Sequence, residues 1–416
     1  MSETRKFWGA GVILLAASFS VNIATFLQQA VQTRWLSDDD FGALKWAMDW
    51  LSYVGTPVGA LHVAMTRYTA VFDAQANAVA VASLAWRATR RLAWYAGAFV
   101  AFVVVAHAWL VRGFRLEQKP GLLWVVAALI VMQLAVPVTM SLLQGLQRFG
   151  WLAATSVVSG WGRLVFGLAL VIAGYGAVGA LSGQLLAVAL GTALSLWALR
   201  ALWHHRRADH SALDTRPIYK YFWPALVVTF SFGTIGLVDT SFVRHYFEQD
   251  ISGQYGKAKL IAQAFGYLVM PLSAVLFPKA AGDAARGGTG ALRALWQAIG
   301  VAAFVGVAAA LACTWLPWLP VRILAGDAAR NQVAVDIVAP FVWAMLPLGL
   351  AALPLQFFLA RAEFRPLLVP LAVLVVAYPA ALWLWHESLL QILAVLAAAG
   401  TVALSVLLWS LRHVGR

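Results

Sequence analysis

The chain has 416 residues, of which 62% are hydrophobic and only 11% are charged, and this composition excludes an ordinary soluble domain. A membrane-spanning helix uses about 20 apolar residues, so the chain has room for about twelve spans. The net charge of +13 needs no nucleic-acid partner, because basic loops lying on anionic lipid account for most of it.

Apolar runs between charged or Pro/Gly breaks predict about twelve spans. In chain order, they cover 8–33, 42–66, 92–112, 121–146, 150–173, 176–199, 221–244, 255–277, 292–316, 333–358, 366–385 and 388–411. The first run is too long for a signal peptide and no small-residue cleavage site follows it. We therefore predict an all-α polytopic membrane protein.

The connections between the predicted spans are short. The longest are 67–91 and 200–220, which leave no room for a soluble catalytic domain, so we expect a protein that is not an enzyme and has no catalytic residues. The only cysteine, Cys313, lies in an apolar run and is expected to pack there. The sequence thus predicts no metal site and no cofactor, and leaves open whether a proton or a sodium ion drives the protein.

The distribution of Lys and Arg predicts the orientation. With the N-terminus inside, the inner segments hold 19 of these residues and the outer segments hold 7. Because positive residues accumulate on the cytoplasmic side, we expect both termini to be cytoplasmic.

Two pairs of similar stretches suggest an internal duplication. Gly42 and Lys45 open the second span, and Gly253 and Lys257 open the eighth at nearly the same spacing. Further on, "LLQGLQRFG" and "FFLARAEFR" each end a span with an arginine and a phenylalanine. We predict two six-helix lobes, 1–208 and 209–416, an arrangement common in transporters with the substrate site between the repeats.

Several stretches resemble the polysaccharide transporter branch of the multidrug/oligosaccharidyl-lipid/polysaccharide flippases. They are "QTRWLSDDDFG" at the second span, "SLLQGLQRFG" at 141–150, the aspartate of "GLVDTSFV", "GQYGKAK" and "VLFPKAA" at 275–281, in the family's order. The resemblance covers nearly the whole chain. It implies two lobes around a central cavity and movement of a polyprenyl-diphosphate-linked oligosaccharide from the inner to the outer leaflet by alternating access.

The same resemblance implies a place in the cell and a set of partners. The expected location is the bacterial inner membrane, and the expected pathway is the synthesis of a polysaccharide such as O-antigen or exopolysaccharide. The expected partners are the lipid-linked oligosaccharide, membrane lipids and other polysaccharide-assembly membrane proteins. The family's peptidoglycan-lipid flippases usually have two further helices, for which this chain has no room.

Charged and polar residues inside the spans are the candidate substrate site, because each is costly in lipid unless it is paired or faces water. At helical spacing, polar stripes follow the first, second and fifth spans, which suggests a common wet surface. Lysine and arginine bind diphosphate oxygens, and hydroxyl and amide groups suit sugars. The candidate cavity residues are Lys45, Asp49, Arg163, Asp239, Lys257, Lys259, Asn22 and Gln29.

Simpler interpretations compete with this one. Lys45 and Asp49, four residues apart, can neutralise each other, and the pair Lys257 and Lys259 can extend to the outer surface. A gate or an interface anchor is the role predicted for Arg34, Arg67 and Arg244. Gly179 and Gly183 predict close helix packing, not a site.

Two functions from other classes compete with the flippase. A cation-coupled multidrug or small-molecule antiporter of the related branch would use the carboxylates as its proton or cation site, but cations outnumber acids inside these spans. A membrane glycosyltransferase, polymerase or ligase would need catalytic carboxylates or arginines on a sizeable outer loop, which the sequence lacks.

Overall fold

The computed structural model describes residues 3–114, 116–117, 119–200, 202, 216–264, 290–361 and 363–413. These residues form helices and turns, with no strand among them. Nine helical segments in this part of the chain are long and apolar enough to cross a membrane. The prediction of an all-α membrane protein is confirmed.

The chain divides into two compact units, and each is described by itself. Unit 1 comprises residues 1–36 and 54–222, and unit 2 comprises residues 37–53 and 223–416. The boundary passes through one continuous helix, α2 (Asp38–Ala74), whose first part belongs to unit 2 and whose remainder belongs to unit 1. Compactness does not test a sequence duplication, so the lobes 1–208 and 209–416 stay a prediction.

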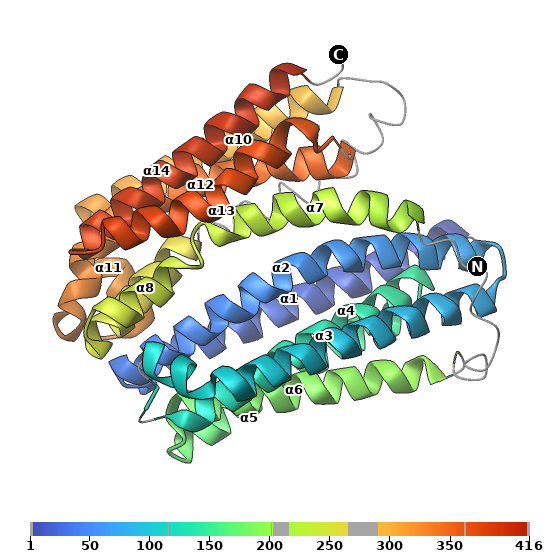
Figure 1. Ribbon diagram of the computed structural model, residues 1–416, viewed down its shortest axis with the longest axis horizontal. Helices are drawn as coiled ribbons and strands as arrows, with labels where there is room; N and C mark the ends of the chain where they lie inside the picture. The colour runs from blue at the N-terminus through green and yellow to red at the C-terminus, as the bar shows by residue number, and fades with distance from the viewer. Residues whose placement is uncertain are drawn as a thin grey trace. The chain divides into compact units, whose positions relative to one another are not determined.

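Unit 1 is a bundle of long helices in which α5 packs along both α1 and α6, and α4 packs on α6 and α3 (Figure 1). Small residues permit the close approach of α5 and α6: a Cβ added to Gly183 would lie 2.2 Å from the backbone nitrogen of Gly167. The packing predicted at this glycine is confirmed. The helices are α1 (Glu3–Trp35), α3 (Ala78–Gly113), α4 (Pro120–Gly145), α5 (Phe149–Ile172) and α6 (Gly176–Ala198).

Unit 2 packs α12 along α14 and α10, with α13 against α14. A further helix without a label covers residues 249–264. Short 3₁₀ turns lie at Ala329–Asn331 and Leu411–His413. The other helices are α7 (Arg216–Thr234), α8 (Asp239–Tyr246), α10 (Gly290–Trp315), α11 (Trp318–Ala325), α12 (Gln332–Arg361), α13 (Arg365–Leu384) and α14 (Leu389–Ser410).

The loop predicted over 67–91 is wrong. Helix α2 continues to Ala74 and α3 begins at Ala78, so only a tight turn separates them. Asn77 caps α3 by accepting a hydrogen bond from the backbone nitrogen of Ala80 at 2.9 Å. Charged residues end an apolar run without ending a helix, which is why the sequence pattern misplaced these boundaries. The predicted connection over 200–220 falls mainly outside the described residues.

The predicted single span over 221–244 is interrupted. Helix α7 ends at Thr234 and α8 begins at Asp239. Between them, Gly236 has φ +82°, and a Cβ there would lie 2.9 Å from the Leu348 side chain. The positive φ favours glycine at this position, because other residues rarely adopt it. The break places Asp239 at the start of a new helix.

Candidate functional site

The acidic stretch after α1 is the start of helix α2. Ser37 precedes the helix, and its hydroxyl accepts a hydrogen bond from the backbone nitrogen of Asp40 at 3.1 Å. In turn, the Ser37 hydroxyl donates to the Asp40 carboxylate at 3.2 Å. Acidic side chains are favourable in the first turn because they face the positive end of the helix dipole. Three consecutive aspartates therefore help to start the helix, and two of them also reach cations elsewhere in unit 2.

Glycines bring the start of α2 against the helix at 249–264. A Cβ on Gly253 would lie 2.0 Å from the backbone oxygen of Asp38, and one on Gly42 would lie 3.0 Å from the backbone nitrogen of Gly253. A Cβ on Gly256 would lie 3.1 Å from the side chain of Lys45. The two glycines that the sequence paired as repeat counterparts are thus in direct contact. Backbone contact at this distance lets side chains on the two helices meet.

The helix at 249–264 places its two lysines on different faces. Tyr255, Lys259 and Gln263 recur every four residues, so they share one face of the helix. Lys257 lies two positions from Lys259 and points elsewhere, because residues two apart on a helix do not face each other. The structure therefore does not bring Lys257 and Lys259 together as one phosphate-binding pair. Lys259 contacts Asp49 and Asp239, whereas Lys257 contacts Asp38.

Lys259 is at the centre of a buried charged cluster, which we define as Lys45, Asp49, Asp239, Thr240 and Lys259. The Lys259 ammonium donates to the Asp49 carboxylate at 2.6 Å and to the Asp239 carboxylate at 2.9 Å. Its third hydrogen bond goes to the Thr240 hydroxyl at 2.6 Å. An ammonium has three donors, so this side chain is fully satisfied inside the protein.

The rest of the charged cluster closes around the same two carboxylates. Lys45 donates to Asp49 at 2.9 Å, and the Thr240 hydroxyl donates to Asp49 at 2.5 Å. Two side chains complete the cluster from the shared face of the helix at 249–264. They are Gln263, which accepts from Lys45 at 2.8 Å, and Tyr255, which donates to Asp239 at 2.5 Å.

The charged cluster is both buried and electrically balanced. Lys259 and Asp239 are 0% exposed, and Lys45 is the most exposed of the four ions at 9%. Two ammonium groups and two carboxylates give a formal net charge of zero. Balance is needed here because an uncompensated charge in a low-dielectric interior costs several kcal/mol. The predicted neutralisation of Lys45 by Asp49 is present, and a second cation and a second acid extend it.

Two further cations hold the acidic start of α2. Lys257 donates to Asp38 and, at 2.8 Å, to the side chain of Asn331. Arg244 lies 3.5 Å from Asp39 and is 0% exposed. Full burial and an acidic partner do not fit an interface anchor, which would expose its guanidinium. The gate role that the sequence suggested for Arg244 stays a prediction.

Arg163 lies in unit 1, whereas the charged cluster lies in unit 2. It is half-buried on α5, and its guanidinium is 3.4 Å from the Thr25 hydroxyl on α1. The indole of Trp161 donates to Ser20, also on α1, at 2.8 Å. The polar stripes expected on the first and fifth spans thus meet.

The remaining candidates differ in burial. Asn22 is exposed and Gln29 is half-buried, whereas the neighbouring Gln28 is buried. Arg34 is exposed in the last turn of α1. Arg67 lies within α2, and its side chain falls outside the described residues.

Sequence reasoning missed several members and neighbours of the charged cluster. Tyr255 and Gln263 share the four-residue spacing of Lys259, and this helical period was a usable signal. Thr240 directly follows Asp239, but no sequence pattern places a hydroxyl against a lysine from another helix. Asn331 lies in a short turn far along the chain, and nothing local points to it.

Among the described residues, no three His, Cys, Asp or Glu side chains gather in a way that could hold a metal ion. What the charged cluster offers chemically is two ammonium groups, each held by the side-chain carboxylate of an aspartate. Any anion that entered would meet two lysines already oriented by hydrogen bonds.

A family model described as "Polysaccharide biosynthesis protein" matches residues 8–281. No curated protein sequence matches the chain.

Solved structures share the fold at low sequence identity. An inward-facing multidrug resistance MATE family transporter of the MOP superfamily aligns with a TM-score of 0.73 at 13% identity, covering 94% of both chains. The lipid II flippase MurJ, in an inward closed conformation, aligns with a TM-score of 0.70 at 14% identity, covering 96% of this chain and 87% of MurJ. An outward-facing MATE transporter gives 0.66 at 14%, covering 97% of this chain and 95% of the transporter. These likenesses establish the MOP flippase fold.

Proposed function

The chain belongs to the polysaccharide biosynthesis protein family, and from this premise we propose that it is a lipid-linked oligosaccharide flippase. It would carry a polyprenyl-diphosphate-linked oligosaccharide from the inner to the outer leaflet of the bacterial inner membrane by alternating access, for the assembly of a surface polysaccharide. Both termini would be cytoplasmic, as the distribution of Lys and Arg predicts. The fold and family are those of a membrane transporter.

The observation that carries the proposal is the buried charged cluster of unit 2. A buried ion pair is a poor source of stability, because well-packed apolar residues of similar volume often do as well or better. Ionisable residues inside membrane segments commonly mark a path for a substrate or an ion. The charged cluster contains four ionisable residues and has no net charge. This composition suits a site at which a charged group of the substrate takes the place of an aspartate carboxylate beside a lysine.

A diphosphate is an anion of the right kind for such an exchange. Its oxygens would compete with the carboxylates of Asp49 and Asp239 for Lys45 and Lys259. Lys45 is the more exposed of the two lysines and would make the first contact. The aspartates would then keep both lysines neutralised whenever no diphosphate is present, so that neither buried cation is left alone.

Arg163 and its hydroxyl neighbours in unit 1 would supply a second polar surface. Its guanidinium can bind phosphate oxygens in pairs, and Thr25, Ser156 and Ser159 lie on the same α1 and α5 stripes. Hydroxyl-rich sugars fit a surface of hydroxyl and amide groups.

The alternative, a cation-coupled antiporter, would hold its coupling ion on the same carboxylates. The Lys259 ammonium already bridges Asp49 and Asp239, so a resident cation occupies the carboxylates that a coupling ion would need. This arrangement favours anion exchange over cation binding at the charged cluster.

The experiment that tests the proposal is a deletion strain of the source bacterium. We expect lipid-linked oligosaccharide to accumulate on the inner leaflet, to be cleared by the unaltered gene, and to be cleared more slowly by Lys45→Gln. Normal export from the deletion strain, or sensitivity to drugs without any lipid-linked sugar accumulating, would reject the flippase in favour of another transport function.

A further inference from the structure

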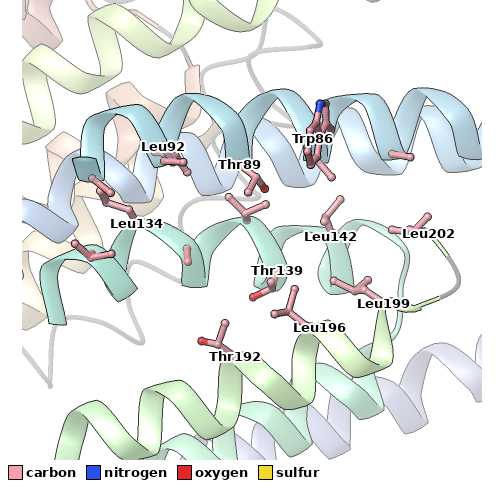
Figure 2. A pocket seen from close by; sticks show the side chains of 17 residues that line it. Trp86, Thr89, Leu92, Leu134, Thr139, Leu142, Thr192, Leu196, Leu199 and Leu202 are labelled. Carbon is pink, nitrogen blue, oxygen red and sulfur yellow. The ribbon is translucent and has the colours of Figure 1, made fainter. Parts of the chain in front are cut away.

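Unit 1 contains an apolar groove that the charged cluster does not involve. It has a volume of about 620 Å³ and is lined by the first part of α3, the second part of α4, and α6 with the residues just after it. Figure 2 shows Leu92 and Leu134 at one end, Leu202 at the other, and Thr89, Thr139 and Thr192 between them. The volume lies in the range of small-ligand sites.

The groove is more apolar than its threonines suggest. The Thr139 hydroxyl donates to the backbone oxygen of Val136 at 3.0 Å, and the Thr192 hydroxyl donates to that of Val188 at 2.8 Å. Both hydroxyls are therefore satisfied by their own helices and present methyl groups to neighbours. Alanines on α3 and α4 leave space in the groove because their side chains are small. They are Ala82, Ala85, Ala93, Ala96 and Ala135.

The groove is long enough to cover the hydrocarbon depth of one leaflet of a membrane. Its lining on α3 runs from Ala82 to Ala96, which is about 21 Å of helix. Half of the hydrocarbon core of a bilayer is about 15 Å. A long lipid chain would thus lie in the groove over the depth of a leaflet, with the rest of the chain in the bilayer.

Arginines lie beside the walls of the groove. Arg90 is exposed and follows the lining residue Trp86 by four positions, which places both on one side of α3. Arg200 is exposed and stacks over the Trp197 ring at 4.6 Å.

Nothing acidic on the lining helices offsets these charges. Helices α3, α4 and α6 contain no acidic residue, and no carboxylate among the described residues pairs with Arg90. An apolar groove beside a surplus of positive charge is complementary to a lipid with an anionic head.

We propose that this groove binds the isoprenoid tail of the lipid-linked substrate, with the diphosphate held near Arg90 and Arg200. The proposal rests on the proposed function, and the charge favours a diphosphate over a phospholipid, whose phosphodiester has a single negative charge. Arg200 borders the 200–220 connection, which is predicted to be cytoplasmic, where the substrate would be loaded. The groove would hold the tail while the sugar head binds the polar surface around Arg163.

The test is photo-crosslinking in proteoliposomes with a polyprenyl-diphosphate sugar that has a diazirine in its tail. We expect labelled peptides from α3, α4 and α6. Ala93→Trp, which fills the groove, should lower this labelling about tenfold, a loss of about 1.4 kcal/mol in binding. Ala98→Trp is the matched control: it is also exposed on α3, but it lies on the face opposite Thr89, and it should label normally.

A second pair of probes tests the head group. Arg90→Gln combined with Arg200→Gln should lower labelling by the diphosphate probe, yet leave labelling by the uncharged polyprenol probe unchanged. Labels that map elsewhere, equal labelling of Ala93→Trp and Ala98→Trp, or full competition by phosphatidylglycerol would overturn the groove as a tail site. Translocation by the unaltered protein is measured in the same liposomes. If translocation occurs while the labels map elsewhere, the groove proposal fails and the flippase proposal stands; if no translocation occurs, both fail.

Discussion

The two units of the chain hold their cations under opposite conditions. In unit 2, Lys45 and Lys259 lie within 2.9 Å of carboxylates, and the charged cluster has no net charge. In unit 1, helices α3, α4, α5 and α6 together contain five arginines and no acidic residue. The comparison teaches that a lysine or arginine inside a predicted span need not be available to bind a substrate, because a carboxylate can already neutralise it. In the charged cluster of unit 2 each lysine contacts a carboxylate, whereas helices α3, α4, α5 and α6 of unit 1 have a surplus of positive charge.

The largest expected effect comes from unbalancing the charged cluster. Lys259→Met leaves Asp49 and Asp239 buried beside a single lysine, so it should lower the free energy of unfolding by about 3–5 kcal/mol. Reversible unfolding in mixed micelles would measure the loss. A Lys259→Met/Asp239→Asn double variant restores the balance and should be more stable than Lys259→Met alone. Strictly additive losses would show that the two side chains do not act as a pair.

The contact between α2 and the helix at 249–264 gives the next largest effect. Gly253→Ala would place its Cβ against the backbone of Asp38, and overpacking of this kind costs about 1–3 kcal/mol. Gly97→Ala in α3 is the matched control, because no atom lies within 4 Å of its added Cβ. The control should be neutral or slightly stabilising, since alanine favours a helix. Equal stability of both variants in thermal unfolding would contradict the close packing on which the charged cluster depends.

A substitution of Arg163 tests the role of unit 1. It should reduce transport and leave stability unchanged. Arg163→Gln keeps a polar group beside Thr25 but removes the charge-assisted contact to phosphate, so glycan export should fall about tenfold. Protein level and thermal stability in detergent should stay near those of the unaltered protein. Arg112→Gln, the same change at the exposed end of α3, is the control and should export normally. Export at the normal rate by Arg163→Gln would make this arginine structural.

Much of the fold could be predicted from hydrophobic periodicity. The expected spans 121–146, 150–173 and 176–199 agree with α4, α5 and α6 to within about a residue or two, because each is bounded by glycine, proline or charge. The continuation of α2 and α3 almost to Asn77 could not be predicted. An apolar pattern marks the part of a helix that lies in lipid, and the helix can continue beyond it. The break at Gly236 was also missed, although two glycines three residues apart marked it.

The candidate site was predictable as a set of residues and not as a geometry. The charges at 45, 49, 239 and 259 were recognised because ionisable groups are rare in membrane spans. Their partners come from helices about 190–210 residues apart in sequence, and no local pattern specifies which lysine meets which aspartate. Residues two positions apart point to different sides of a helix, so Lys259 enters the charged cluster and Lys257 contacts Asp38 instead.

The most direct measurement is translocation in proteoliposomes containing a labelled polyprenyl-diphosphate oligosaccharide. A membrane-impermeant glycosidase outside the liposomes would report the rate at which the sugar head reaches the outer leaflet. The unaltered protein should raise this rate well above that of protein-free liposomes, and Lys45→Gln should slow it by weakening the contact to the diphosphate. A rate equal to that of protein-free liposomes, or equal acceleration of a phospholipid without a diphosphate, would contradict the proposal of a flippase for a lipid-linked oligosaccharide.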